Sequence, residues 1–315
     1  MSIAFVFPGQ GSQQVGMGRA LAEASASARE VFDEVDEALG QKLSSLMWEG
    51  PEDALTLTEN AQPALMAVSL AVVRTLMAEH GIAITTPAYV AGHSLGEYSA
   101  LAAAGTFGLA DAARLLKLRG QAMQRATPVG VGAMAALIGL DYETAAMVAR
   151  DAARGEICQP ANDNAPGQIV LSGHRGAVER AVELAKARGA RRALMLTVSA
   201  PFHCTLMQPA AEVMAEALET VDMKPPVVPL MANVTARALK DPAAIRAGLV
   251  RQVTATVRWR ECVSVMANDG VSFFAELGSG KVLSGLAKRI APDATAVSAG
   301  TPDEIAALAS QISAN

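Results

Sequence analysis

The stretch GHSLG at 92–96 places a serine between two glycines, after an apolar run and before an alanine-rich one. This spacing is typical of a nucleophile elbow, in which a strand ends in a strained turn that opens a helix and exposes the serine hydroxyl. The glycines leave room where strand and helix cross, and the backbone N–H of Leu95 would be free to donate to a developing oxyanion. The spacing makes Ser94 a candidate nucleophile; a serine that only caps a helix beside a flexible glycine is the alternative.

A serine hydroxyl needs a general base, and the chain contains four histidines. His80 closes a helix, where the helix dipole favours it. His93 neighbours the serine and is expected to have a structural role in the turn, and His174 opens a helix in a separate segment. His203, in SAPFHC, is therefore the candidate base by elimination, on a geometry that the sequence alone does not contain.

The remaining motifs favour neither a metal site nor a phosphate site. The chain has three cysteines with no ligand or disulfide spacing: Cys158, Cys204 and Cys262. Cys204 follows His203, and on a strand the two side chains would point to opposite faces, which argues against a thiol nucleophile. GSGK at 278–281 lacks the earlier glycine of a phosphate loop, and Val282 stands where Ser or Thr would bind magnesium. It predicts a glycine turn that opens a helix.

Arg119 lies among leucines in the helix that the pattern predicts over 109–125. An arginine in such a segment usually lies on the solvated face or extends its stem along apolar surface. Buried beside a reactive group, its guanidinium would instead hold a carboxylate through two hydrogen bonds, a task that lysine does less well. The residues by themselves leave both interpretations open.

Composition narrows the class of protein that must position these residues. The 315 residues are 51% hydrophobic and 18% charged, which is typical of a well-packed globular chain. A net charge of −5 gives no electrostatic reason to bind nucleic acid, although a local basic patch for an acidic partner stays open. The apolar run at 3–7 is shorter than a signal-peptide core, and the uncharged stretch at 126–140 is shorter than the ~20 residues of a membrane span. We expect a cytoplasmic protein with no membrane partner.

Strands alternate with helices along the chain, which predicts an α/β fold with a mostly parallel sheet. Between 128 and 199 the predicted order is βαββαβ, that of a ferredoxin-like unit. We therefore predict a small ferredoxin-like subdomain at 128–199, inserted into a large catalytic subdomain formed by 1–127 and 200–315. The elements expected in the large subdomain are strands at 3–7, near 87–92, near 228–231 and near 271–277, and helices at 60–80, 95–104 and 109–125.

Several motifs together resemble a known family. They are FPGQGSQ at 7–13, NAQPAL at 60–65, GHSLGEYSAL at 92–101, RGQAMQ at 119–124, NAPGQIVLSG at 164–173, PFHC at 201–204 and ELGSGKVLSGL at 276–286. From residue 3 to about 298 the chain closely resembles the malonyl-CoA:acyl carrier protein transacylases of bacterial type II fatty acid synthesis. It is also similar to the acyltransferase domains of polyketide synthases. The resemblance implies an α/β-hydrolase-like large subdomain that carries a ferredoxin-like one.

The resemblance also implies roles for individual residues. Ser94 would be the nucleophile and His203 the general base. The backbone N–H groups of Gln10 and Leu95 would form the oxyanion hole. The backbone carbonyl of Gln252 would orient His203, so no acidic third residue is expected.

For the substrate, the resemblance matches Arg119 to the family arginine that pairs with the malonyl carboxylate. Phe202 precedes His203 where many free-standing members have serine and where malonyl-selective polyketide acyltransferases also have phenylalanine. Its ring would crowd a 2-methyl branch, a contact worth ~1–3 kcal/mol of discrimination. Thr256 stands where relatives often have proline, and we expect it to change loop stiffness and nothing in the chemistry.

The implied activity moves malonate from malonyl-CoA to the phosphopantetheine thiol of acyl carrier protein, with no metal and no redox cofactor. Such carrier proteins are acidic, so KARGARR at 186–192 and KR at 288–289 are candidate contacts for one. The alternatives are an acyltransferase of a polyketide or malonate decarboxylase pathway, a serine thioester hydrolase, and a non-catalytic module that binds a carrier protein.

Overall fold

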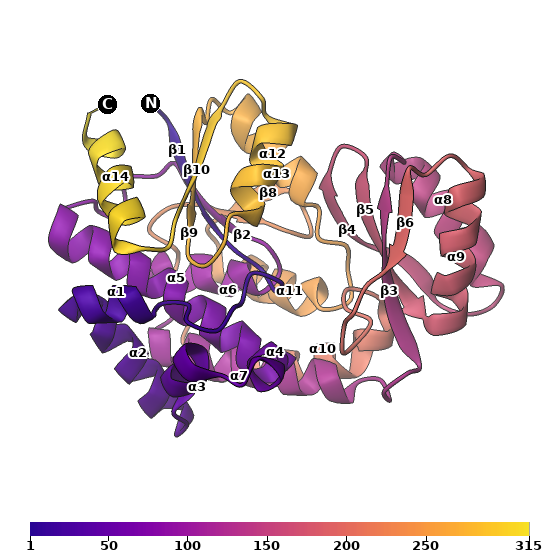
Figure 1. The fold of residues 1–315 in the computed structure, drawn as a ribbon, viewed down its shortest axis with the longest axis horizontal. Coiled ribbons are helices and arrows are strands. Elements are labelled where there is room, and N and C mark those ends of the chain that lie inside the picture. The colour runs from indigo at the N-terminus through magenta and orange to yellow at the C-terminus, as the bar shows by residue number, and fades with distance from the viewer. Residues whose placement is uncertain (315) are drawn as a thin grey trace.

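The chain folds around two sheets that lie side by side (Figure 1). A computed structural model describes residues 1–314, and over these residues the strands form a six-stranded and a four-stranded sheet. The strands are β1 (Ile3–Phe7), β2 (Tyr89–Gly92), β3 (Gly132–Ile138), β4 (Cys158–Ala165), β5 (Gln168–His174), β6 (Arg192–Met195), β7 (Leu230–Ala232), β8 (Arg237–Leu239), β9 (Phe273–Leu277) and β10 (Thr295–Ala299). The helices are α1 (Arg19–Ala24), α2 (Ala26–Leu39), α3 (Leu43–Glu49), α4 (Glu52–Thr56), α5 (Thr58–His80), α6 (Leu95–Ala103), α7 (Leu109–Arg125), α8 (Tyr142–Ala153), α9 (Arg175–Ala187), the 3₁₀ turn η1 (Thr205–Met207), α10 (Gln208–Glu219), α11 (Pro242–Gln252), α12 (Trp259–Asn268), α13 (Val282–Ile290) and α14 (Pro302–Ser313).

The large sheet has the strand order β10-β9-β1-β2-β7-β8 and is parallel except for β8. Its strand β1, IAFVF, is buried along its whole length. Phe5 and Phe7 pack into the core on one face of the sheet, and Ala4 and Val6 pack on the other, because alternate side chains of a strand face opposite ways. The predicted α/β fold with a mostly parallel sheet is confirmed. Since parallel strands end at one edge, the loops after β1, β2, β7 and β9 meet there.

The small sheet is antiparallel, with the strand order β4-β5-β3-β6. Helices α8 and α9 cover its outer face, over a core of small apolar side chains (Figure 1). The chain order βαββαβ is the ferredoxin-like order predicted from the sequence. The strands lie between residues 132 and 195, inside the predicted subdomain 128–199, whose bounds remain a prediction.

Helix α5 is long and apolar enough to cross a membrane by length and composition. However, 78% of its most apolar window is buried inside the protein, where it packs against α2, α6 and α7. A lipid-facing helix would leave that surface uncovered by protein. We therefore assign α5 to the core of the large subdomain.

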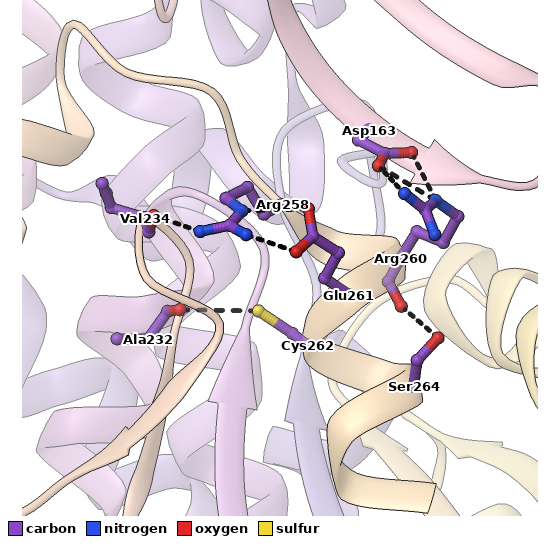
Figure 2. A network of polar contacts seen from close by, with 8 residues as sticks. All are labelled: Asp163, Ala232, Val234, Arg258, Arg260, Glu261, Cys262 and Ser264. Atoms are coloured by element: carbon purple, nitrogen blue, oxygen red, sulfur yellow. Dashed lines mark hydrogen bonds and ion pairs between the residues drawn. The ribbon is translucent and has the colours of Figure 1, made fainter. Parts of the chain in front are cut away.

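The two sheets are joined where β4 meets the segment before α12. Val257 pairs with β4 in parallel, accepting a hydrogen bond from the Asp163 N–H and donating one to the Ala161 carbonyl, both at 2.9 Å. The buried Asp163 carboxylate accepts two hydrogen bonds from Arg260 Nε, at 3.0 and 3.1 Å (Figure 2). Burial raises the pKa of Asp163, although Arg260 opposes that rise. This ion pair fastens the small sheet to the start of α12.

We expect Arg260→Met to destabilise the protein by about 2 kcal/mol at pH 8, since a buried carboxylate loses a cation that is itself partly solvated. The pKa of Asp163 is already raised, so in the variant the carboxyl takes up a proton as the pH falls, and the loss should shrink at pH 5. Urea unfolding at both pH values measures this difference. Arg19→Met, which removes an exposed pair with Glu23, is the control and should change little at either pH. An equal loss for Arg260→Met at pH 5 and pH 8 would contradict the assignment.

Candidate active site

Ser94 lies at the turn between β2 and α6, at the carboxyl edge of the large sheet. Its backbone has φ 54° and ψ −108°, a left-handed conformation that side chains other than glycine rarely adopt. A Cβ on Gly92 would lie 1.9 Å from the backbone carbonyl of Gly96, and one on Gly96 would lie 2.2 Å from the Phe7 carbonyl oxygen. The strand, the helix and the need for both glycines are therefore as the GHSLG spacing predicts.

His203 is the histidine that the fold brings to this serine. Its Nε2 lies 2.8 Å from Ser94 Oγ, and its Nδ1 lies 2.8 Å from the backbone carbonyl oxygen of Gln252. A carbonyl only accepts, so Nδ1 carries the proton, and the lone pair of Nε2 accepts the serine hydroxyl. The arrangement is that of a serine and its general base, with a main-chain carbonyl in the place of an acid.

The protonation state of His203 suits a base. The side chain is buried, and this burial, followed by the charge of Arg119, lowers the pKa of His203 to about 3. The imidazole is therefore neutral at pH 7, able to take a proton from Ser94. An imidazolium formed there is unstable and returns its proton readily to a leaving group.

Arg119 is buried, 1% exposed, and its guanidinium lies beside the nucleophile. Nη1 donates to Gln62 Oε1 at 2.7 Å, while Nη2 donates to Gln252 Oε1 at 2.9 Å and to Ser94 Oγ at 3.1 Å. The guanidinium also lies 5.6 Å from the centre of the Tyr98 ring. The solvated interpretation left open by the sequence is wrong, and a cation sits where an acyl group on Ser94 would extend.

Two backbone amides face the same cavity, which has a volume of about 370 Å³ and is lined by Gln10, Ser94, Leu95, Arg119, Phe202 and His203. Among residues 1–314 no acceptor takes the N–H of Gln10 or of Leu95. The N–H of Ser94, in contrast, donates to Asn233 Oδ1 at 2.8 Å. Gln10 and Leu95 are thus two of the unpaired backbone donors among the described residues of the cavity wall, and both suit a developing oxyanion.

Three polar residues of the site escaped the sequence reasoning. Gln62 binds Arg119 from within the apolar helix α5, and Asn233 follows β7. Glu97, 2% exposed, accepts a hydrogen bond from Gln252 Nε2, and burial raises its pKa to about 7. Each has a feature in the sequence that could have indicated it. Gln62 is an amide inside an apolar helix, Asn233 is a polar residue at the end of a strand, and Glu97 is an acid three residues after Ser94.

Two of the other three histidines, His93 and His174, have structural partners. His93 Nε2 lies 2.8 Å from Asn164 Oδ1, and its ring lies 5.8 Å from that of Trp259. His174 Nδ1 accepts from the Ile157 N–H at 2.9 Å, in the small sheet. Neither contacts Ser94 Oγ, in agreement with the structural roles expected for them.

Two expectations need correction. Cys204 and His203 lie in a turn, not on a strand, with His203 at φ 58°; Cys204 is kept from the site because its buried Sγ donates to the Pro201 carbonyl. Thr256 does more than alter stiffness, since its Oγ1 donates to the Pro160 carbonyl of β4 at 2.6 Å, a bond that proline lacks.

The GSGK turn opens α13, as predicted. The N-terminal amides of this helix are already occupied, because the buried Glu276 carboxylate accepts hydrogen bonds from the N–H groups of Leu283 and Ser284 at 3.0 and 2.7 Å. A phosphate would have to displace this carboxylate. Over the described part of the chain, no group of three or more His, Cys, Asp or Glu side chains is arranged to hold a metal ion.

Comparison with known proteins gives consistent matches. The sequence model of a family described as "Acyl transferase domain" matches residues 4–313. The chain is 47% identical over 304 residues to a malonyl CoA-acyl carrier protein transacylase of Bacillus subtilis, covering 96% of this chain and 95% of that protein. Among solved structures, an acyl-carrier-protein-S-malonyltransferase from Bartonella henselae superposes with a TM-score of 0.97 at 55% identity, over 99% of this chain and 100% of that one.

A further solved structure contains a partner. This structure is a type II polyketide synthase acyl-carrier protein in complex with its malonyl-transacylase. This chain matches a chain of that structure with a TM-score of 0.96 at 43% identity. The match covers 99% of this chain and 100% of that one. The similarity thus extends over both sheets.

The lowered pKa of His203 generates a test that needs no substrate. Labelling of Ser94 by phenylmethylsulfonyl fluoride should keep its rate constant within about threefold from pH 8 to pH 5, because His203 stays neutral there. His203→Ala should lower that rate by about 100-fold or more. Glu97→Gln, followed in parallel, separates any contribution from a carboxyl with a pKa of about 7. A wild-type rate that falls tenfold per unit below pH 6.5 would mean that His203 has an ordinary pKa.

Proposed function

The chain belongs to the acyl transferase family, and we propose that it transfers a malonyl group from malonyl-CoA to the phosphopantetheine thiol of acyl carrier protein. Ser94 carries the acyl group as an ester, and His203 moves the protons. The observation that carries the proposal is the guanidinium of Arg119, buried and 3.1 Å from Ser94 Oγ. A buried cation beside the nucleophile fits an acyl group that ends in a carboxylate.

In the first half-reaction His203 Nε2 takes the proton of Ser94 as Oγ attacks the thioester carbonyl of malonyl-CoA. The N–H groups of Gln10 and Leu95 donate to the resulting oxyanion, each worth ~3–4 kcal/mol in sites of this kind. The carbon–sulfur bond then breaks, and the departing thiolate takes the proton from the imidazolium. Free CoA and a malonyl ester on Ser94 remain.

In the second half-reaction the phosphopantetheine thiol gives its proton to His203, and its sulfur attacks the ester carbonyl. The carbon–oxygen bond breaks and Ser94 Oγ recovers the proton. Every atom and proton is accounted for by the two thioesters, the serine and the histidine, so no cofactor beyond the substrates enters the scheme. The order of events is ping-pong.

The malonyl carboxylate has a second effect on the base. The charge of Arg119 contributes to the low pKa of His203. A carboxylate bound to Arg119 offsets that charge, so the histidine becomes a stronger base when the correct acyl group is present. An acetyl group would leave Arg119 uncompensated. Selectivity therefore acts on the proton transfer as well as on binding.

We place this activity in the cytoplasm, supplying fatty acid synthesis. The match to a transacylase that serves a type II polyketide carrier protein favours polyketide synthesis as the second candidate. A hydrolase would need water to reach the ester. The similarity to a transacylase over 96% of this chain favours transfer to a thiol over that outcome.

The first prediction from this proposal concerns the covalent adduct. Intact-protein mass after mixing with malonyl-CoA should show one malonyl group on Ser94, and acetyl-CoA or methylmalonyl-CoA should give little adduct. Arg119→Ala should lose malonyl labelling by about 100-fold or take up acetyl instead, because the carboxylate loses its cation. Arg114→Ala, an exposed arginine of the same helix, is the matched control and should label normally.

Three outcomes would contradict this scheme. Free malonate released without an adduct would indicate a hydrolase. A folded protein that neither labels nor turns over would indicate a module that only binds the carrier protein. Equal labelling by malonyl-CoA and acetyl-CoA, unchanged in Arg119→Ala, would remove the role of Arg119.

The carrier protein should dock beside β6. Arg191 and Arg192 are exposed at the start of this edge strand, no described carboxylate pairs with them, and the residues after the strand, from Leu196, line the mouth of the cavity. The other basic residues fit less well: Arg188 pairs with Asp151, and Arg289 is tied to the small sheet through the Pro166 carbonyl.

Replacing Arg191 and Arg192 by Glu should raise KM for acyl carrier protein about tenfold at low salt, since rim charges mainly steer association. KM for malonyl-CoA and transfer to a small thiol such as N-acetylcysteamine should stay unchanged. The matched control is Arg237→Glu with Lys240→Glu, which makes the same charge change at β8, the far edge of the large sheet. Equal losses with both acceptors would refute this docking surface.

A further inference from the structure

The backbone of Ser94 is held in a conformation that it would not adopt alone. A residue other than glycine at φ 54° and ψ −108° costs ~1–3 kcal/mol and persists only where its surroundings overdetermine it. The side chain of Ser94 makes no capping bond to α6, because its Oγ is engaged by His203 and Arg119. The backbone itself is restrained by groups that bind the peptide units on both sides of the turn.

Asn233 supplies two side-chain bonds on the N-terminal side, where the His93 N–H also donates to the Phe7 carbonyl. Its Nδ2 donates to the Gly92 carbonyl at 2.8 Å, and its Oδ1 accepts from the Ser94 N–H at 2.8 Å. One planar amide thus bridges the last residue of β2 and the nucleophile. Asn233 is fully buried, so water does not compete for either bond. The bridge fixes the peptide from which the strained φ of Ser94 begins.

The backbone around Asn233 is itself held by α12 and the residue before it (Figure 2). Arg258 donates its N–H to the Asn233 carbonyl at 3.0 Å and its Nη1 to the Val234 carbonyl at 3.3 Å. Cys262 Sγ donates to the Ala232 carbonyl at 3.5 Å. Three successive carbonyls are therefore bound to one helix, and the Asn233 side chain starts from a fixed point.

The C-terminal side of the turn is held from α11. Gln252 Nε2 donates to the Ser94 carbonyl at 3.0 Å and to the Glu97 carboxylate, and it lies 3.4 Å from Asn233 Oδ1. The Glu97 carboxylate in turn accepts from the Asn233 N–H at 3.4 Å. The two amides and the carboxyl form one closed network below the nucleophile.

From these contacts we infer that Asn233 is a positioning residue for the nucleophile, whose amide holds Ser94 in its strained conformation. The inference rests on the proposed function only for the acyl donor used in one of its tests. Because Asn233 occupies the Ser94 N–H, that amide is not available as an oxyanion donor.

The test compares Asn233→Ala and Asn233→Asp with Asn60→Ala. Asn60 is a matched control, a buried amide in the first turn of α5 whose Nδ2 donates to the Ala54 carbonyl. Asn233→Ala should lower the rate of malonyl transfer about 100-fold with KM for malonyl-CoA within about threefold, because a displaced nucleophile loses attack geometry while the binding residues remain. Labelling of Ser94 by phenylmethylsulfonyl fluoride should fall in parallel. Asn60→Ala should lose stability and keep both rates.

Asn233→Asp should make the labelling rate depend on pH, in a direction that a merely structural residue would not produce. The carboxylate still accepts from the Ser94 N–H but repels the Gly92 carbonyl. As the pH falls the buried carboxyl takes up a proton and can donate to that carbonyl, so the labelling rate should rise about tenfold from pH 8 to pH 5. The wild-type rate stays flat over that range.

Each unexpected result would have a different interpretation. Wild-type protein that labels with the sulfonyl fluoride but not with malonyl-CoA would sink the proposed function and leave the labelling test of Asn233 intact. A labelling rate in folded Asn233→Ala within threefold of wild type, or a flat pH profile in Asn233→Asp, would overturn the inference. So would unfolding of both Asn233 variants beside a folded Asn60→Ala, since Asn233 would then serve the fold and not the nucleophile.

Discussion

The site depends on a buried cation whose closest partners are neutral. Arg119 donates to two side-chain amide oxygens and to the serine, and no carboxylate in residues 1–314 forms a hydrogen bond or an ion pair with it. Burying an unpaired charge is costly, so the surrounding core must hold it rigidly. The nearest acid, Glu97, is separated from it by the amide of Gln252 and has a pKa raised to about 7 by burial. Because Glu97 interacts with Arg119 through the Gln252 amide and not through a direct contact, the charge of Arg119 remains available to a substrate carboxylate, and it lowers the pKa of the neighbouring His203.

The fold assembles this site from the carboxyl edge of the parallel sheet and from one return of the chain. Gln10 follows β1, Ser94 follows β2 and Asn233 follows β7. The small sheet is an excursion between α7, which carries Arg119, and the turn that carries His203. The chain thus leaves the large subdomain after Arg119 and returns to it with His203. The ion pair between Asp163 and Arg260 binds the small sheet to α12, and residues of the small sheet line one wall of the cavity.

The sequence predicts the features that depend on neighbouring residues better than those that depend on contacts between residues far apart in the chain. The bounds of β1 and α7 are local patterns and agree with the structure residue for residue, whereas β8 and β10 were missed because they are short and partly exposed. Ser94 and Leu95 also follow from local spacing. The network below them does not: Asn233 and Ser94 are 139 residues apart, and Gln252 and Glu97 are 155 apart. Backbone roles, such as those of Gln10 and Gln252, leave no trace in side-chain type and entered only through family resemblance.

Two of the four described residues other than glycine that have positive φ meet at the site. Ser94 at φ 54° and His203 at φ 58° are both left-handed, and their side chains are joined by a 2.8 Å hydrogen bond. Gln252 holds both, with its side chain on the Ser94 carbonyl and its backbone carbonyl on His203 Nδ1. A rotation at either residue would break the contact, and one residue of α11 opposes both rotations. The cost of the conformation is met when the protein folds, so in the proposed mechanism Ser94 and His203 need no reorganisation during either half-reaction.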